Sequence, residues 1–216
     1  FIEKKLISFR AKYKKISSVE LSSLVAKELA NSKTVGWFQG RMEFGPRALG
    51  SRSILADPRS DQTQKNLNIK IKFRESFRPF APSILEEDTK NWFDIDVNSP
   101  YMLLVAQINK QKKIHMNIKQ QNLFGIDKLN IKRSEIPAVT HVDYSARIQT
   151  VTKDTNNRYY DLISKFKEKT GCPVVVNTSF NVRGEPIVNT PTDAFNCFMG
   201  TELDYLVIGD CILDKT

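Results

Sequence analysis

The chain of 216 residues is 40% hydrophobic and 26% charged, a composition typical of a globular protein with one domain, or one domain and an insertion. No apolar run approaches the ~20 residues that a membrane span requires, so we expect no membrane association. Three scattered cysteines are too few for a disulfide framework or a zinc site, and they favour reduced thiols in a cytoplasmic protein.

The net charge of +9 is concentrated in two segments. Residues 1–17 carry six basic groups against one acidic group, and residues 107–135 carry seven against two, so the rest of the chain is near neutral. Because residues 1–17 begin without Met or the apolar core of a signal peptide, we interpret them as a basic leader or linker from a preceding domain. A solvated charged surface accounts for the excess charge, and an RNA-binding surface is the alternative.

The first part of the chain alternates helical and extended patterns. Residues 17–31 predict a helix, because they open with the capping-box pattern Ser-x-x-Glu and their leucines recur at helical spacing. Short strands are predicted at 34–38 and 53–56, and a helix at 62–71. A further strand at 80–85 contains a proline, which predicts an edge strand or an irregular one.

Alternation continues in the second part and decides the fold class. Apolar periodicity fades over residues 107–135, which we interpret as a polar insertion or mobile loop. Around it the patterns predict helices at 86–93, 158–169 and 192–199, and strands at 102–108, 147–151, 173–177 and 205–208. We therefore expect an α/β fold, with residues 18–216 as one domain.

Residues 40–59 contain four arginines and no lysine, although lysines outnumber arginines in the chain as a whole. A guanidinium grips phosphate or carboxylate through two parallel hydrogen bonds, so the choice of Arg indicates a site of fixed geometry. Glycines in the same stretch let the backbone approach a ligand closely. The alternative is that these arginines pair with Glu43 and Asp57 at the surface.

A second basic cluster lies in residues 70–82. Lys72, Arg74 and Arg78 are interleaved with three aromatic residues and stiffened by two prolines. There are two alternatives for the aromatic rings: they stack on a purine, or they fill the core. Basic groups on such a rigid apolar base are suited to hold phosphates in a partly desolvated site.

A third cluster follows an apolar strand. Residues 174–176 lead directly into hydroxyl, amide and guanidinium groups, at Asn177, Ser179, Asn181 and Arg183. In open α/β sheets ligands bind at the carboxyl ends of strands, which is where these groups fall. A polar turn with capping side chains is the structural alternative.

Other candidates for catalysis are weak. His115 and His141 are isolated, so we expect no metal site in this chain. The glycines form neither a phosphate loop nor a dinucleotide-binding motif, and no pair of nucleophile and base follows from spacing. Many oxyanion-binding groups without a nucleophile favour phosphoryl or adenylyl transfer, in which catalysis depends on positioning and charge stabilisation.

Four motifs resemble the C-terminal half of the O-carbamoyltransferase family, which carbamoylates nodulation factors, aminoglycosides and cephalosporins. They occupy residues 40–59, 77–82, 146–151 and 177–186, and the similarity extends over residues 20–215. The corresponding domain of that family resembles the YrdC-like fold. The resemblance therefore implies a twisted mixed sheet with flanking helices around a basic cavity.

The resemblance also implies a reaction in two stages. Carbamoyl phosphate is cleaved to carbamate, which attacks the α-phosphate of ATP to give carbamoyl adenylate, with Mg²⁺ accompanying the nucleotide. By the same resemblance, the residues that hold phosphates are Arg47, Lys72, Arg78, Arg147 and Arg183. Those that contact the nucleotide or its magnesium are Arg74, Asn177, Ser179 and Asn181.

The N-terminal domain of that family is not recognisable in this sequence. It is an actin/Hsp70-like ATPase fold that carries an iron-type metal site, the acceptor site and the final transfer step. We therefore expect this chain to depend on such a domain as its partner. The alternatives are an RNA-binding YrdC-like module and a non-catalytic scaffold that only docks the other domain.

Overall fold

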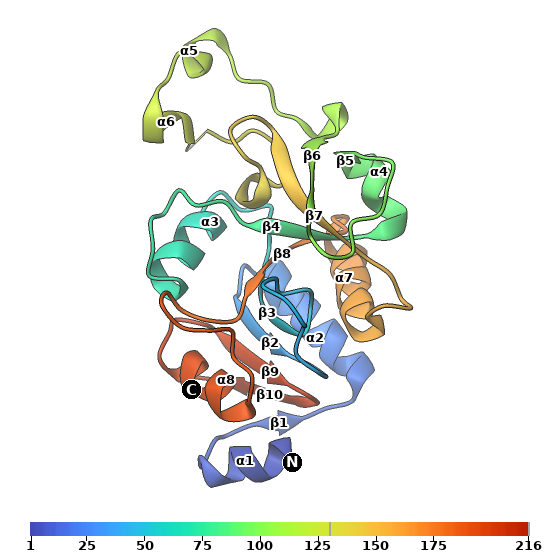
Figure 1. The fold of residues 1–216 in the computed structure, drawn as a ribbon, viewed down its shortest axis with the longest axis vertical. Helices are drawn as coiled ribbons and strands as arrows, with labels where there is room; N and C mark the ends of the chain where they lie inside the picture. The colour runs from blue at the N-terminus through green and yellow to red at the C-terminus, as the bar shows by residue number, and fades with distance from the viewer. Residues whose placement is uncertain (130, 216) are drawn as a thin grey trace.

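The computed structural model describes residues 1–129 and 131–215, and its strands form one mixed sheet (Figure 1). The strand order is β1-β10-β9-β2-β3-β8-β4-β7-β6-β5. The strands are β1 (Lys14–Lys15), β2 (Val35–Phe38), β3 (Arg52–Ala56), β4 (Ala81–Leu85), β5 (Phe93–Asp94), β6 (Leu104–Ile108), β7 (Ser145–Val151), β8 (Val174–Ser179), β9 (Tyr205–Ile208) and β10 (Cys211–Asp214).

Strand direction in the sheet is mixed, as the YrdC-like resemblance implies. β2 pairs with β9, and β4 with β7, in parallel. The other neighbouring pairs in the described part of the chain are antiparallel. The predicted α/β class is confirmed.

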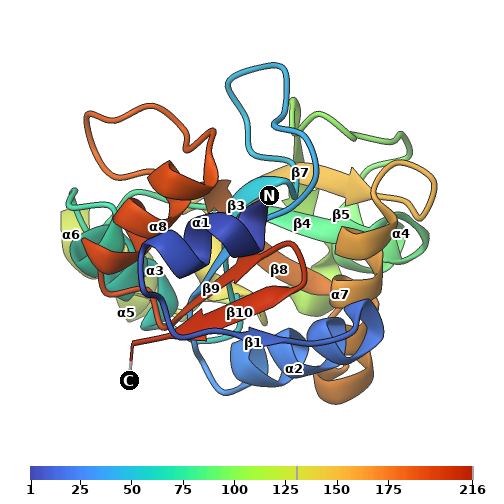
Figure 2. The same ribbon diagram turned by 90° about the horizontal axis from the view of Figure 1, so that it is seen from below.

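Helices cover both faces of the sheet. α2 and α7 pack together on one face, and α1 and α8 lie on the other (Figure 2). The α-helices are α1 (Ile2–Ser8), α2 (Ser18–Ala30), α3 (Thr63–Asn66), α4 (Thr89–Trp92), α5 (Ile118–Gln121), α6 (Gly125–Leu129), α7 (Asn157–Thr170) and α8 (Pro191–Met199). The other helical segments are the π-helical turn η1 (Leu67–Ile71) and the 3-10 turns η2 (Glu86–Asp88), η3 (Lys110–Lys112) and η4 (Pro137–Val139).

The predicted start of α2 is confirmed in detail. The Ser17 side chain accepts a hydrogen bond from the Glu20 amide, and the Glu20 carboxylate accepts one from the Ser17 amide. Each bond satisfies a backbone donor that the first turn of a helix leaves free. Leu21, Val25 and Leu29 are buried on the inner face of the helix, which packs against α7.

Residues 1–17 are part of the fold, which differs from the expected leader or linker. β1 pairs with β10 and extends the sheet at one edge. Leu6 of α1 is fully buried, and the ring of Phe9, just after α1, stacks on that of Phe195 with centroids 4.9 Å apart. Apolar residues spaced among the lysines hold this segment in place, a pattern that its high charge concealed.

The prediction that the strand at 80–85 lies at an edge, or is irregular, is wrong. β4 lies inside the sheet, between β8 and β7. Pro82 is opposite Val176 of β8, one residue before the pairing with β7 begins at Ser83. The proline is tolerated because it precedes the ladder on one side of the strand.

Residues 109–129 and 131–135, called the arm below, extend away from the sheet at the top of Figure 1. The predicted polar insertion is therefore present, although it contains the short helices α5 and α6. Its return to the body is fixed by Arg133, which is buried and donates hydrogen bonds to the carbonyl oxygens of Lys128, Leu129, Thr140 and His141.

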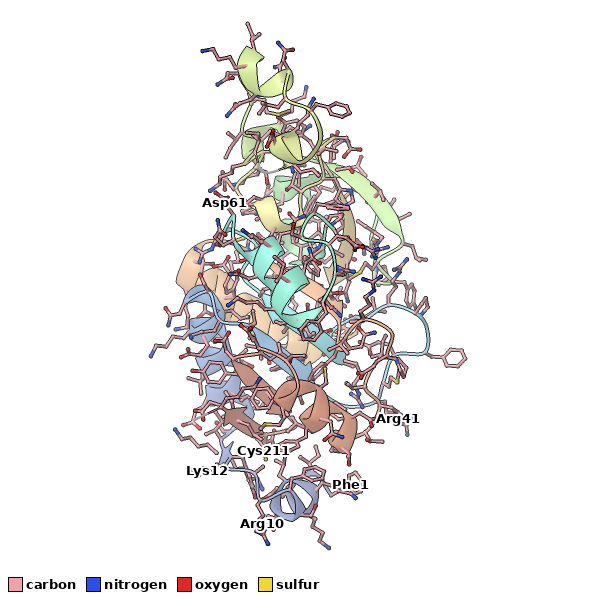
Figure 3. All side chains as sticks on the ribbon, turned by 90° about the vertical axis from the view of Figure 1, so that its left-hand side faces the viewer. Phe1, Arg10, Lys12, Arg41, Asp61 and Cys211 are labelled. Carbon is pink, nitrogen blue, oxygen red and sulfur yellow. The ribbon has the colours of Figure 1, made fainter. Side chains whose placement is uncertain are left out.

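The basic ends of the molecule lie far from each other. Arg10 and Lys12 are at the end formed by α1, opposite the arm (Figure 3). Within the described residues, we find no helix with the length and apolar character that crossing a membrane would take.

Candidate active site

The loop between β2 and β3 is organised by one carboxylate. Oε1 of Glu43 accepts hydrogen bonds from the backbone amides of Leu49 at 2.7 Å, Ser51 at 2.8 Å and Arg52 at 3.3 Å. The other oxygen, Oε2, is buried without a hydrogen-bond partner. Glu43 thus folds the loop on itself. The alternative pairing of an arginine with Asp57 is present, since Nη2 of Arg59 lies 2.6 Å from Oδ2 of Asp57.

Close packing fixes the end of the same loop. Gly50 has a φ of 102°, and a Cβ atom there would lie 2.2 Å from the ring of Tyr159 on α7. Only glycine has both the conformation and the space for this approach. Arg47, which the loop carries, is exposed to solvent beside the cavity described next.

A cavity of about 160 Å³ lies where β8 ends. It brings together five of the nine predicted site residues, which come from the loop, from the segment after η1, from β7 and from β8. Its lining includes Arg47, Arg74, Arg147, Asn177 and Ser179.

Arg147 on β7 is half-buried at this cavity. Its burial, and next the charge of Arg47, lower the pKa of its guanidinium. Nε of Arg147 is buried and has no hydrogen-bond partner. An anion in the cavity would relieve the repulsion between the two arginines.

Arg74 is oriented by two contacts. Its Nε donates to Oδ1 of Asn68 at 2.6 Å, and its guanidinium lies 5.0 Å from the centre of the Phe80 ring. Burial, and then the charge of Arg78, lower the pKa of Arg74. Phe80 is buried and lines the cavity, so it serves as core and as a support for Arg74.

Asn177 and Gln149 connect the sheet to the loop. Nδ2 of Asn177 contacts the carbonyl oxygen of Ala48 at 3.0 Å and Oε1 of Gln149 at 2.9 Å. Nε2 of Gln149 donates to the carbonyl oxygen of Leu49 at 2.9 Å. Sequence reasoning missed Gln149: it lies within a motif of the resemblance, but its function depends on a partner 100 residues away.

Lys72 is buried beside the cavity and faces oxygen atoms. Its Nζ donates to Oδ1 of Asn181 at 2.8 Å, to the carbonyl oxygen of Asn181 at 2.9 Å and to the carbonyl oxygen of Ser179. Burial, and next the charge of Arg74, lower the pKa of Lys72 to about 7. The acceptors favour the charged amine, which opposes the cost of burial.

Arg78 and Arg183 are not brought to the cavity wall. The side chain of Arg78 is 52% exposed, and its Nε lies 2.9 Å from Oε2 of Glu75. Arg183 is also exposed, and its charge acts on the same carboxylate. The pKa of Glu75 is lowered by a backbone hydrogen bond and by the charges of both arginines. Their assignment to phosphates stays a prediction.

A larger cavity, of about 660 Å³, is lined by residues that adjoin Lys72. Phe73, Val182 and Cys197, which neighbour Lys72 in sequence or space, form part of its wall. The wall also carries Glu185 and Asp193, and neither Lys nor Arg is among its described residues. This cavity therefore suits an uncharged, partly apolar group better than a phosphate.

Similarity to known proteins identifies the family of the chain. Residues 26–215 match the family described as Carbamoyltransferase C-terminus. The uncharacterized protein sll1178 of Synechocystis is 58% identical over 207 residues, which cover 96% of this chain and 34% of that protein. Nodulation protein NolO of Bradyrhizobium diazoefficiens is 43% identical over 92% of this chain and 33% of its own.

Two further similarities extend the comparison. A 3'-hydroxymethylcephem-O-carbamoyltransferase of Streptomyces clavuligerus is 36% identical over 86% of this chain and 31% of that enzyme. The crystal structure of full-length HypF in its phosphate- and nucleotide-bound form is similar in fold, with a TM-score of 0.51 and 16% identity over 94% of this chain and 22% of HypF. The chain spans about a third of the length of the curated relatives it matches. Its sequence over residues 26–215 shows that the chain belongs to the carbamoyltransferase C-terminus family.

Proposed function

We propose that this chain binds carbamoyl phosphate and ATP and forms carbamoyl adenylate. The observation that carries the proposal is the cavity lined by Arg47, Arg74 and Arg147. Arginines stay charged at every physiological pH, so three of them at one small cavity require an anion of high charge density. A phosphate group meets this requirement.

The charges on the walls of the two cavities indicate which ligand each one binds. Carbamoyl phosphate belongs in the cavity of about 160 Å³, among the arginines. The adenosine part of ATP belongs in the cavity of about 660 Å³, whose wall is partly apolar and carries two carboxylates. Lys72 contacts Ser179 of the smaller cavity and precedes Phe73 of the larger one, so we assign its amine to the phosphates of the nucleotide.

The reaction proceeds in two steps, hydrolysis and adenylation. Hydrolysis of carbamoyl phosphate releases phosphate and carbamate. A carbamate oxygen then forms a bond to the α-phosphorus of ATP, and pyrophosphate leaves. Both steps develop charge on phosphate oxygens, which preorganised guanidinium groups stabilise without reorganising. Free carbamate is labile, so the reaction benefits from a site that is shielded from bulk water.

A magnesium ion would reach the site with the nucleotide. Ser179 and Asn181 do not form a good magnesium site in the present arrangement, because Oδ1 of Asn181 already accepts from Nζ of Lys72 and Oγ of Ser179. We therefore assign no protein ligand to this ion. Ser179 and Asn181 instead position Lys72.

Transfer of the carbamoyl group to a hydroxyl acceptor is assigned to an N-terminal domain outside residues 1–216. NolO and the cephem O-carbamoyltransferase are about three times as long as this chain. Deprotonating a hydroxyl requires a base and a pocket that positions the acceptor. The iron-type metal implied by the family resemblance is placed in that domain.

The RNA-binding alternative is less well supported. RNA binding relies on exposed cationic groups in an extended patch. Arg74 and Arg147 are instead half-buried around a small cavity, and Arg133 of the arm is buried and bonded to carbonyl oxygens.

The proposal is tested by carbamoyl-phosphate-dependent exchange of labelled pyrophosphate into ATP. We expect exchange with residues 1–216 alone and no carbamoylation of any acceptor. Titration calorimetry with carbamoyl phosphate and a non-hydrolysable ATP analogue provides the separate measurement of binding. Folded protein that binds neither ligand would refute the proposal. Binding without exchange would show that the adenylation site needs another domain.

A further inference from the structure

Residues 97–108 form an uncharged apolar segment at the surface of a highly charged protein. The segment was predicted to end in an apolar strand, and it does, as β6. Much of that strand is nevertheless exposed: Leu104 is 40% exposed and Val105 is 61% exposed, and Leu103, just before the strand, is 70% exposed. Tyr101, just before the strand, is exposed as well.

β6 also has an open edge. Its pairing with β7 covers residues 104–107, whereas its other neighbour, β5, reaches only Gln107 and Ile108. In the described part of the chain, residues 104–106 thus pair on one side only. Native proteins protect such edges with charged side chains, prolines or bulges, because an apolar open edge pairs with other chains. Residues 101–108 contain neither a charge nor a proline.

The exposed side chains lie next to the arginine cavity. Val105 is opposite Arg147 in the antiparallel register, so the two side chains share one face of the sheet. Leu103 is two residues before Val105 and lies on the same face. Met102, between the cavity and this apolar row, is itself part of the cavity wall.

We propose that the open edge of β6, with Leu103 and Val105, binds an extended apolar segment from the part of the enzyme outside residues 1–216. The segment adds a strand to β6 and covers the cavity beside Arg147. Main-chain hydrogen bonds supply affinity in this mode of binding, and alternate side chains supply specificity.

Two observations select this occupant. The curated relatives contain about twice as much additional chain as the third that matches residues 1–216. The apolar row also lies on the cavity face, so whatever covers it also limits the access of water to the arginines. The role of the added strand as a cover for the cavity rests on the proposed function. The binding of the strand itself does not, and its test does not depend on catalysis.

Hydrogen exchange provides the test. The matching third of the Synechocystis relative is replaced by residues 1–216, and exchange of the Val105 amide in this hybrid is compared with that in residues 1–216 alone. The Val105 amide faces the open edge, because the Ile108 amide donates to Tyr144 and alternate amides of the strand, those of Leu104 and Ala106, therefore face β7. We expect exchange at least about tenfold slower in the hybrid, as for amides that enter a stable ladder. The Leu103→Lys substitution should abolish most of this protection. Phe124→Lys, which changes a 94% exposed apolar side chain of the arm, should not.

Equal exchange in the hybrid and the isolated chain would overturn the inference, provided that Val174–Ser179 stays equally protected in both. Protection that instead rises with the concentration of residues 1–216 alone would assign the edge to a second copy. If the hybrid does not fold, the segment of the unaltered full-length relative aligned with residues 101–108 is measured, with the same two outcomes. Loss of ligand binding by residues 1–216 would count against the proposed function and leave this measurement valid.

Discussion

Leu49 is held from both sides: its amide donates to Oε1 of Glu43 at 2.7 Å, and its carbonyl oxygen accepts from Nε2 of Gln149 at 2.9 Å. The first bond closes the loop, and the second attaches it to β7. Because Arg147 is two residues from Gln149 on the same strand, one connection sets the position of Arg47 relative to Arg147.

Replacing Glu43 with Gln should loosen this loop. A neutral amide oxygen is a weaker acceptor than a carboxylate for the three backbone amides, and hydrogen bonds to charged groups contribute about 1.5–3 kcal/mol. We expect a loss of stability of that order in urea unfolding and weaker binding of carbamoyl phosphate. Glu202→Gln, which removes only an exposed ion pair with Lys70, should change stability by at most about 1 kcal/mol. Equal effects of the two substitutions would contradict the assignment.

Arg47→Lys and Arg147→Lys should each weaken the binding of carbamoyl phosphate although charge is conserved. Lysine lacks the planar fork of donors, so a bidentate contact is lost, at a cost of about 1.5–3 kcal/mol. Calorimetry measures the change. Arg10→Lys, at the α1 end of the molecule, is the matched control and should bind like the parent (Figure 3). Unchanged binding by both cavity variants would show that these arginines do not hold the ligand.

Gly50→Ala should destabilise the protein more than Gly184→Ala. Both glycines have positive φ, so alanine is strained at either position. Only at Gly50 would the new methyl group also collide with a neighbour, the Tyr159 ring at 2.2 Å, whereas nothing lies within 4 Å at Gly184. Backbone strain alone costs about 1–3 kcal/mol. A thermal-unfolding midpoint of Gly50→Ala that equals that of Gly184→Ala would exclude the steric contribution.

Lys72 should make stability depend on pH. The pKa of its amine is about 7 in the folded protein, against 10.5 for an ordinary lysine. Between these values the unfolded chain binds more protons than the folded one, so the free energy of unfolding rises with pH across this window. Lys72→Met lacks this contribution, so the parent should gain stability relative to the variant from about pH 7 to pH 10. Lys90→Met controls for a surface charge. Parallel profiles would mean that the oxygen acceptors keep Lys72 charged.

Replacing Arg133 should reduce the stability of the protein more than deleting the tip of the arm. Its buried guanidinium donates only to carbonyl oxygens, so Arg133→Met leaves several buried acceptors without donors, at about 1–3 kcal/mol each. Deleting residues 116–124 shortens an exposed excursion, and loop-closure entropy depends only weakly on length. Thermal unfolding should therefore show a clear loss for the substitution and little change for the deletion. A greater loss from the deletion would show that the tip packs against the body.

Local patterns in the sequence determined the elements of the fold. The capping box before α2, the helical spacing of leucines on it and the β-branched run of β8 are short-range signals, and they predicted these elements correctly. Candidate ligand-binding residues were also identified from short stretches of sequence. The choice of Arg in residues 40–59, and the polar groups after Val176, identified residues that line the cavity.

Only the tertiary structure decided which of these groups meet. Arg47, Arg74 and Arg147 are far apart in sequence, and the order of the strands brings them to one cavity, while Arg78 turns to Glu75. The same holds for the interior position of β4 and the burial of Leu6, since Pro82 and a run of lysines each favour a different local reading. Propensity and charge act over a few residues, whereas strand pairing and burial depend on partners up to 200 residues away, and those partners determine where each side chain lies.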